Sequence, residues 1–344
     1  MRTESNSCPS IIEVVRGQLV ESRHRGYIAV VDGRGRLAAS VGDISVRTWY
    51  RSAAKPFQTL ALVESGAAEA FGLTQAELAV ITGSHSGEEV HLEAVRSILE
   101  KIGLAETSLL CGAHMPFDDA AARELRSSGR SPSVLHNNCS GKHAGMLAFC
   151  RRLGAPVENY IDPEHPIQRR IRNVIALFSG IGEDEIDVAI DGCSAPVFGL
   201  TIEQMARGYG ALVAGSIREE SAARVVGAMI EYPEMVGGSR KRLDTDLMRV
   251  MNGTLISKVG AEGVQLLGVR PNENYPHGLG IAIKIEDGDI RRARDPVVIE
   301  TLRQLGLIDP RQAAALSAYA GSKQFNYRGL EVGEVRPAFT LVNH

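Results

Sequence analysis

The segment YIAVVDGRGRLAASV, residues 27–41, gives the clearest indication of the fold. Two apolar runs, rich in β-branched residues, flank the glycine-containing turn Asp32-Gly33-Arg34-Gly35, which is the pattern of a β-hairpin. Apolar runs of the same kind occur near both ends of the chain, at residues 11–17, 255–258, 263–269 and 280–286. We therefore expect strands from the two ends to pair in one mostly antiparallel sheet.

The middle of the chain, roughly residues 52–251, carries apolar residues at helical spacing. The expected helices are Ser52–Phe71, Glu88–Ile102, Ala120–Arg126, Lys142–Leu153, Pro163–Phe178, Thr201–Val213, Glu219–Ile230 and Thr245–Met251. A short buried strand is expected at Ile186–Ile190, and a final helix at Asp295–Leu305. Helices covering such a sheet predict an α+β layered fold, and no repeat or long linker argues against a single domain over residues 1–344.

Composition favours a small-molecule site. The 344 residues carry 38 basic and 41 acidic side chains, a net charge of −3, so no excess of positive charge serves nucleic acid or an anionic membrane surface. No stretch reaches the roughly 18 apolar residues that a membrane span needs. The N-terminal MRTESNSCPS lacks the apolar region of a signal peptide. Five cysteines, odd in number and without a CxxC pair, indicate reduced thiols, so we expect a cytoplasmic protein.

The first candidate for chemistry is Ser52-Ala53-Ala54-Lys55, at the start of an expected helix. This Ser-x-x-Lys spacing places both side chains on one face, one turn apart. A serine hydroxyl becomes a strong nucleophile only when a base takes its proton, and a lysine can be that base when burial or a neighbouring cation lowers its pKa. The alternative is a capping serine beside a solvated lysine.

Two further segments contain a serine or a lysine of interest. Thr82–Glu88 delivers Ser84 and His85 together after an apolar run, although a helix cap at Ser86 would also explain these residue types. Ser257–Gly263 carries a lysine at position 258 followed by glycine, as in the Lys-Thr-Gly strand of penicillin-recognising enzymes. The alternative there is an edge-strand lysine, which protects sheets from aggregation.

Two polar loops carry cysteines. His136–Met146 reads HNNCSGKHAGM and contains Cys139, and the segment after the expected short strand contains Cys193. The two thiolates could bind a zinc ion, with Lys142 or His143 nearby. The alternatives are a cysteine nucleophile or two buried, inert thiols.

Taken together and in this order, these blocks closely resemble the rhizobial-type L-asparaginase family. The resemblance covers about residues 10 to 340 and rests on five matching blocks, at residues 51–58, 84–88, 138–146, 191–193 and 258–263. It implies a fold similar to those of glutaminases and serine β-lactamases. It also implies hydrolysis of L-asparagine to L-aspartate and ammonia.

The resemblance assigns roles to individual residues. It implies two Ser–Lys tandems, Ser52 with Lys55 and Ser84 with Lys258. It implies a zinc site made by Cys139, Cys193 and Lys142. It further implies a homodimer.

The mechanism expected from these roles begins with Lys55 taking the proton of Ser52, which attacks the amide carbon to form an acyl-enzyme. Ser84 and Lys258 would relay a proton to the leaving ammonia. The order of motifs favours Ser52 over Ser84 as the attacking serine, but it leaves the choice open. Candidates for orienting the substrate's α-carboxylate and α-amine are Arg51, His143 and Asp191.

Two other functions remain open at this point. A glutaminase or β-lactam-type acyl hydrolase would turn over L-glutamine or a chromogenic β-lactam. A non-catalytic zinc- or amino-acid-binding protein would bind its ligand without releasing ammonia. Two Ser–Lys pairs favour an enzyme, since binding alone needs no nucleophile with a base.

Overall fold

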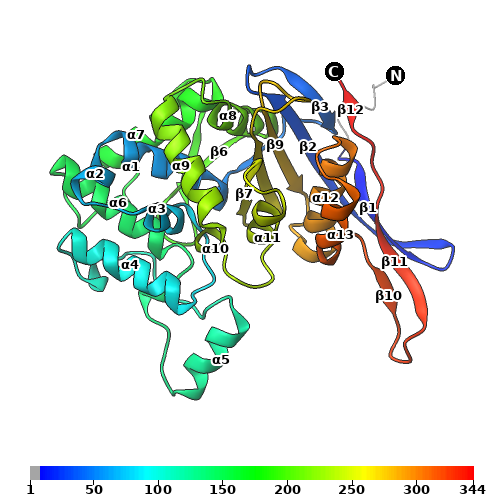
Figure 1. Cartoon of the computed structure of the whole chain (residues 1–344), viewed down its shortest axis with the longest axis horizontal. Helices are drawn as coiled ribbons and strands as arrows, with labels where there is room; N and C mark the ends of the chain where they lie inside the picture. The colour runs from blue at the N-terminus through cyan, green and yellow to red at the C-terminus, as the bar shows by residue number, and fades with distance from the viewer. Residues whose placement is uncertain (1–7) are drawn as a thin grey trace. The chain divides into compact units, whose positions relative to one another are not determined.

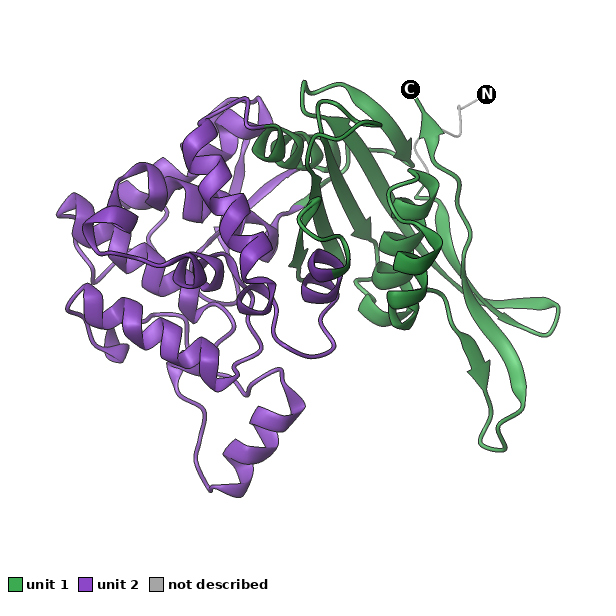
Figure 2. Ribbon diagram, viewed as in Figure 1, with its two compact units in different colours: residues 1–48, 201–214, 250–344 green, residues 49–200, 215–249 purple. Residues whose placement is uncertain are grey.

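The computed structural model describes residues 8–344, which divide into two compact units (Figure 2). Unit 1 comprises residues up to 48, 201–214 and 250–344, and unit 2 comprises residues 49–200 and 215–249. The division follows the expected boundary between chain ends and helical middle, except that residues 201–214 join the ends. The single domain over the whole chain stays a prediction. Residues 1–7, which contribute to the expectation of no signal peptide, lie outside the described part.

Unit 1 is built on a mostly antiparallel sheet, as expected. Among residues 8–344 its nine strands are β1 (Ser10–Arg16), β2 (Leu19–Asp32), β3 (Leu37–Val41), β7 (Leu255–Gly260), β8 (Val264–Val269), β9 (Leu279–Ile285), β10 (Lys323–Phe325), β11 (Glu331–Pro337) and β12 (Val342–Asn343). Their order is β10-β11-β1-β2-β9-β8-β7, with β3 paired to β2 and β12 paired to β3. Strands from the two ends of the chain thus meet in one sheet, since β2 pairs with β9 and β1 with β11.

The predicted hairpin is confirmed. Ile28 of β2 faces Val41 of β3, and Val31 faces Leu37, with the glycine-containing turn between them. The inner positions Ile28 to Val31 are all buried, because β2 is covered on its flanks by β3 and β9. These four residues form part of the apolar core of unit 1.

Helices cover this sheet (Figure 1). Unit 1 contains α8 (Ile202–Ala214), α12 (Asp295–Gln304) and α13 (Pro310–Ala315). The α8 helix packs on β2, β8 and β9. It approaches β9 so closely that a Cβ at Gly280 would collide with the carbonyl of Ala206 on the helix. Glycine at this position therefore permits the helix-on-sheet contact.

Unit 2 is mainly helical. Its helices are α1 (Lys55–Glu64), α2 (Ala67–Ala70), α3 (Gln75–Thr82), α4 (Glu89–Lys101), α5 (Asp119–Ser127), α6 (Ser140–Leu153), α7 (Pro166–Ser179), α9 (Glu219–Glu231), α10 (Pro233–Val236) and α11 (Leu243–Val250). Strands β5 (Asp187–Ile190) and β6 (Pro196–Thr201) pair antiparallel. The α1 helix packs on α3, α6, α7 and α9, and so lies at the centre of the unit.

Local sequence explains where several of these helices begin and end. Thr74 and Glu77 exchange hydrogen bonds at the start of α3, which is a capping box. Asp118 accepts two backbone N–H groups at the start of α5. Gly154 and Gly180 end α6 and α7 in the left-handed conformation that glycine adopts without strain.

Three expectations about secondary structure are wrong. The helix predicted over Ser52–Phe71 is interrupted, because Gly66 adopts a positive φ of 74° between α1 and α2. The strand predicted at Ile186–Ile190 exists as β5 but is not buried: Ile190 is 74% exposed, since β5 is an edge strand. The helix at Asp295–Leu305 is not the final element, because α13 and three strands follow it.

The α+β class, with a mostly antiparallel sheet covered by helices, is confirmed. In the described part of the chain, no helix has both the length and the apolar character needed to cross a bilayer.

Candidate active site

Lys55 is the first residue of α1, and its side-chain nitrogen lies among three oxygen acceptors. Nζ donates to the carbonyl of Gly83 at 2.6 Å, to Oγ of Ser84 at 3.0 Å and to the carbonyl of Asn138 at 3.4 Å. Only 1% of Lys55 is exposed. The structure thus brings Lys55 directly to Ser84, and in the described part of the chain Ser52 is not an acceptor of Nζ.

The surroundings of Lys55 favour its neutral form. Burial lowers its pKa, because the ammonium loses its hydration. The neighbouring side chains of Cys139 and Cys193 raise the pKa, and the charge of Lys142 lowers it. A lysine with a lowered pKa is available as a proton acceptor at lower pH than an exposed lysine.

Arg51 and Ser52 belong to a single 3₁₀ turn, η2 (Arg51–Ala54), that leads into α1. Arg51 has a φ of 51°, which is uncommon for a residue with a Cβ atom. Its Nε donates to Oδ1 of Asp191 at 2.7 Å. Burial opposes ionisation of Asp191, but the charges of Lys142 and Arg51 lower its pKa. Two of the residues predicted to orient substrate therefore form an ion pair with each other.

His85 lies in the loop after α3 and is fully buried. Its Nδ1 accepts the N–H of Gly87 at 3.2 Å, so Nε2 carries the proton and donates to Oγ of Ser140 at 2.9 Å. The ring stacks on His91, with 5.0 Å between ring centroids. Burial, followed by the neighbouring His91, lowers the pKa of His85 well below its usual value. His85 is thus a neutral imidazole that connects the Ser84 loop to the start of α6.

The helix-cap interpretation of Ser86 is wrong. The α4 helix begins after Glu88, whose N–H donates to Nδ1 of His91 at 3.1 Å. Oγ of Ser86 instead donates to the carbonyl of Gly237 at 2.9 Å, far along the chain. The hydroxyl groups of this loop therefore do not serve the helix that follows them.

The structure brings the predicted zinc ligands together. Cys139 precedes α6, Lys142 lies in its first turn, and Cys193 follows β5. Nζ of Lys142 donates to Sγ of Cys193 at 2.8 Å, and the thiol of Cys139 shares a hydrogen bond with the same sulfur. None of the three is more than 4% exposed.

These three groups share one negative charge. The hydrogen bond from Cys139, together with the charge of Lys142, lowers the pKa of Cys193 to about 4 despite its burial. The same hydrogen bond, and burial, raise the pKa of Cys139 to about 12. The pKa of Lys142 is raised: burial lowers it, but the attraction of the two sulfurs outweighs that effect. The arrangement is a thiolate paired with an ammonium and a thiol.

Two of the three side chains, the cysteines, are of a type that binds zinc. In residues 8–344 no three His, Cys, Asp or Glu side chains form a group that could hold a metal. The predicted trio contains only two such side chains, both cysteines, with Lys142 as the third. Cysteine sulfurs are common zinc ligands, whereas a lysine nitrogen binds a metal only in its neutral form and Lys142 is held here as an ammonium. Zinc would replace the protons that the trio now shares, since ligands bind in their deprotonated forms.

His143 lies one residue further along α6 and is fully buried. The hydroxyl of Tyr160 accepts the N–H of Leu110 at 2.8 Å and lies 2.7 Å from Nδ1 of His143. Nε2 of His143 is buried with no hydrogen-bond partner among the described residues. Burial, followed by the charge of Lys142, lowers the pKa of His143 well below its usual value. A neutral ring with one unsatisfied nitrogen agrees with a ligand-binding role.

Lys258 belongs to unit 1, on β7, and is fully buried. Its Nζ donates to the carbonyl of Val259 at 3.0 Å. β7 is an edge strand, as the alternative interpretation requires, but the buried side chain of Lys258 cannot act as an exposed protective lysine. The pairing of Lys258 with Ser84, which belongs to unit 2, stays a prediction.

Sequence reasoning missed some of the groups that surround the Ser84 loop. The carbonyls of Gly83 and Asn138 are backbone groups, so no side chain in the sequence identifies them as acceptors. Arg242 donates to the carbonyl of Ser84 at 2.9 Å. The sequence GGSRKR, residues 237–242, could have drawn attention, because functional residues concentrate on loops and these residue types favour a loop.

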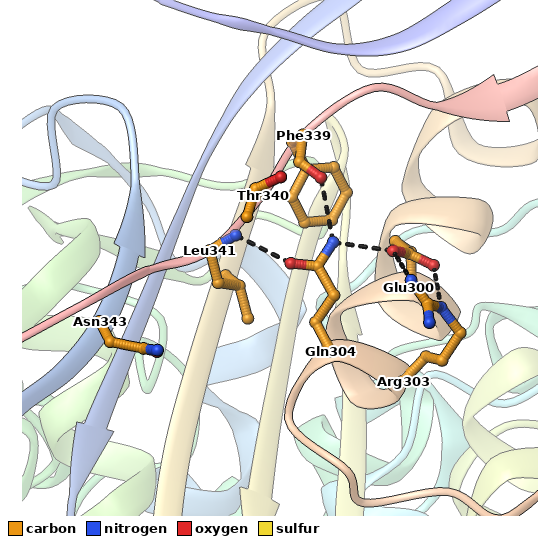
Figure 3. A pocket seen from close by; sticks show the side chains of 7 residues that line it. All are labelled: Glu300, Arg303, Gln304, Phe339, Thr340, Leu341 and Asn343. Atoms are coloured by element: carbon orange, nitrogen blue, oxygen red, sulfur yellow. Dashed lines mark hydrogen bonds and ion pairs between the residues drawn. The ribbon is translucent and has the colours of Figure 1, made fainter.

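Unit 1 contains a separate hollow of about 380 Å³, shown in Figure 3. Gln304 lies at its centre: its amide nitrogen donates to Glu300 and to the carbonyl of Phe339, and its amide oxygen accepts the N–H of Leu341. Glu300 also pairs with Arg303 at 2.7 Å. These groups satisfy one another and fasten the C-terminal segment, and the hollow brings together none of the predicted site residues.

The site thus combines a buried lysine bonded to a serine hydroxyl with a thiol pair and a neutral histidine. Over residues 12–337 the chain matches the family model described as L-asparaginase II. The chain belongs to the L-asparaginase II family, a family of amidohydrolases. No curated protein sequence matches it significantly.

Several solved structures are similar to this chain at low sequence identity. One is Mglu in its native form in the presence of 4.3 M NaCl, with 17% identity, 83% of this chain and 62% of that chain covered, and a TM-score of 0.43. Mglu in its tris and glutamate form has 16% identity, coverage of 88% and 64%, and a TM-score of 0.45. A probable glutaminase from Bacillus subtilis complexed with 6-diazo-5-oxo-L-norleucine has 14% identity, coverage of 82% and 84%, and a TM-score of 0.41. This chain thus spans less than two thirds of the length of those two Mglu chains.

Proposed function

We propose that this protein hydrolyses the side-chain amide of L-asparagine to L-aspartate and ammonia through an acyl-enzyme. The observation that carries the proposal is the contact between Lys55 and Ser84: a buried lysine nitrogen lies 3.0 Å from a serine hydroxyl. Family membership supplies the reaction class. A binding protein would have no need for a proton acceptor at a hydroxyl group.

In the proposed mechanism, neutral Lys55 takes the proton of Ser52 as its oxygen attacks the amide carbon. Lys55 then passes a proton to Oγ of Ser84, and Ser84 gives its own proton to the departing nitrogen, so ammonia leaves and the ester remains on Ser52. Water hydrolyses this ester with the same groups acting in reverse. The contact between Lys55 and Ser84 supports the relay step. Ser52 as the nucleophile follows from the family pattern.

Other predicted roles are part of the proposal. Arg51 and Asp191 would exchange their mutual ion pair for the substrate's α-carboxylate and α-amine, since both keep some exposure, 26% and 10% of their side chains. His143 would bind substrate through Nε2. Lys258 would assist Ser84 in the relay.

Cys139, Lys142 and Cys193 would hold zinc. When bound, zinc supplies a positive centre that can hold a substrate oxygen or a water. We also propose a homodimer and a cytoplasmic location. Exposed apolar side chains at the tips of the β1–β2 and β10–β11 hairpins, Leu19, Phe325 and Tyr327, are consistent with a second copy binding there.

The test is ammonia release from L-asparagine and, in parallel, from L-glutamine, by the wild type, Ser52→Ala and Ser84→Ala. We expect release from asparagine by the wild type, loss of that release in Ser52→Ala and a strong reduction in Ser84→Ala. Ammonia release from L-glutamine alone would show that the substrate is L-glutamine and not L-asparagine. Activity that survives in Ser52→Ala and disappears in Ser84→Ala would make Ser84 the nucleophile. Binding without ammonia release from either amide would contradict the enzymatic function.

A further inference from the structure

The loop that carries Ser84 is held by a second segment of unit 2, residues 236–242. The N–H of Ser84 donates to the carbonyl of Val236 at 2.8 Å, and Oγ of Ser86 donates to the carbonyl of Gly237 at 2.9 Å. These bonds join positions about 150 residues apart. The segment therefore acts as a brace along the loop.

Arg242 is the last residue of this brace and makes two contacts with the loop. Its Nη2 donates to the carbonyl of Ser84 at 2.9 Å, and its Nη1 donates to Oγ of Ser86 at 2.9 Å. A planar guanidinium fixes the direction of both hydrogen bonds at once, and its charge strengthens them. A lysine could not span the two acceptors with the same geometry.

The loop and the brace are in close contact. A Cβ at Gly238, which has a φ of 137°, would collide with the side chain of Ser86. The brace also contacts Glu88, which accepts the N–H of Ser239 at 2.8 Å. Arg242 thus completes a packed, hydrogen-bonded contact.

We propose that Arg242 is a positioning residue for the amide hydrolysis: it fixes the backbone of Ser84 so that the Ser84 hydroxyl stays on Lys55. Val236 holds the N–H of Ser84 and Arg242 holds its carbonyl. With both backbone groups fixed, rotation about χ1 is the main freedom left to the side chain, and the 3.0 Å bond to Lys55 Nζ selects one rotamer.

This inference rests on the proposed function. It says that the relay depends on a residue that holds the backbone carbonyl of Ser84. An error in the position of a reacting group of about 1 Å can reduce turnover about 10²-fold. Loss of Arg242 should therefore lower kcat and leave KM nearly unchanged.

The experiment measures kcat and KM for ammonia release by the wild type, Arg242→Ala, Arg242→Lys and the control Arg249→Ala. Arg249 lies on α11 and is about half exposed, paired with Glu234 at 3.1 Å. We expect Arg242→Ala to lose about 10²-fold in kcat, Arg242→Lys to recover a minor part, and the control to match the wild type. Added guanidinium ion at a non-denaturing concentration should restore turnover in Arg242→Ala and have no such effect on Ser84→Ala.

Ser86→Ala provides a second variant that removes one of the two acceptors and keeps the guanidinium, so it applies even if Arg242→Ala does not fold. It should lower kcat by a smaller factor than Arg242→Ala. Wild-type kcat in Arg242→Ala or in Ser86→Ala would overturn the positioning role while leaving the proposed function intact. A loss in Arg242→Ala that guanidinium does not restore would also overturn it. A wild type that releases no ammonia from either amide would overturn the proposed function together with this inference.

Discussion

Two buried lysines, Lys55 and Lys142, lie at the starts of the packed helices α1 and α6, and their surroundings shift the pKa in opposite directions. Around Lys55 the oxygen acceptors are neutral carbonyls and a hydroxyl, and burial outweighs the opposing effect of Cys139, so the pKa falls. Around Lys142 the direct acceptor is the sulfur of Cys193, so the nearby negative charge decides and the pKa rises. The same side chain is thus disposed to accept a proton in one region and to stay a cation in the other.

The largest effect should come from removing the Ser84 hydroxyl group next to Lys55. Ser84→Ala removes the acceptor of the Lys55 proton, and we expect kcat for ammonia release to fall by about 10²–10⁴-fold, the range for loss of a proton-transfer group. Steady-state kinetics measure this. Arg249→Ala serves as the control, and an equal loss in that variant would show that the effect is not local.

Breaking the Lys142 region should affect stability and metal content. Lys142→Met removes the cation from a sulfur that stays buried, and we expect a loss of about 1.5–3 kcal/mol in the free energy of unfolding. Zinc content per chain, measured by elemental analysis, should also fall. Unchanged zinc content with wild-type stability would contradict the account of this trio.

The neutral histidine pair between the two regions predicts a dependence of stability on pH. The pKa values of His85 and His91 are lowered, chiefly by burial, from about 6.5. Below pH 6.5 the unfolded chain therefore binds protons that the folded chain does not, so stability falls as pH falls through that range. Urea unfolding at pH 5 and pH 8 measures the difference, and His91→Phe should reduce it. Equal stability of the wild type at the two pH values would contradict neutral histidines.

The smallest effect should come from Arg51, at the rim of both regions. Arg51→Ala removes a partly exposed ion pair, so its cost in stability should stay within about 1 kcal/mol. If Arg51 binds the substrate's α-carboxylate, KM should rise while the melting temperature stays close to that of the wild type. A wild-type KM would remove Arg51 from the substrate site.

Sequence patterns predicted the parts of this molecule that depend on neighbours along the chain. The 27–41 hairpin and helices such as α4 follow from periodicity and turn residues. The α3 helix was missed because it has only eight residues and most of them are buried. Its apolar and polar residues therefore do not alternate with a recognisable helical period. Strands β10 to β12 were missed because their weakly apolar sequence forms strands only against β1, β3 and β11.

The same distinction applies to the site. The motifs identified Lys55, Ser84 and the two cysteines as residue types suited to chemistry. They did not predict that Lys55 contacts Ser84, nor that Arg242 holds Ser84 from 158 positions away. Such contacts depend on how helices pack, and one sequence contains no direct record of them.

The most direct test of the central claim compares Lys55→Met with the wild type for ammonia release from L-asparagine, with circular dichroism as a check on folding. We predict that the folded variant loses turnover at every pH, because methionine cannot take the proton that Lys55 would accept. A folded Lys55→Met variant that releases ammonia at the wild-type rate would contradict the assignment of Lys55 as the base.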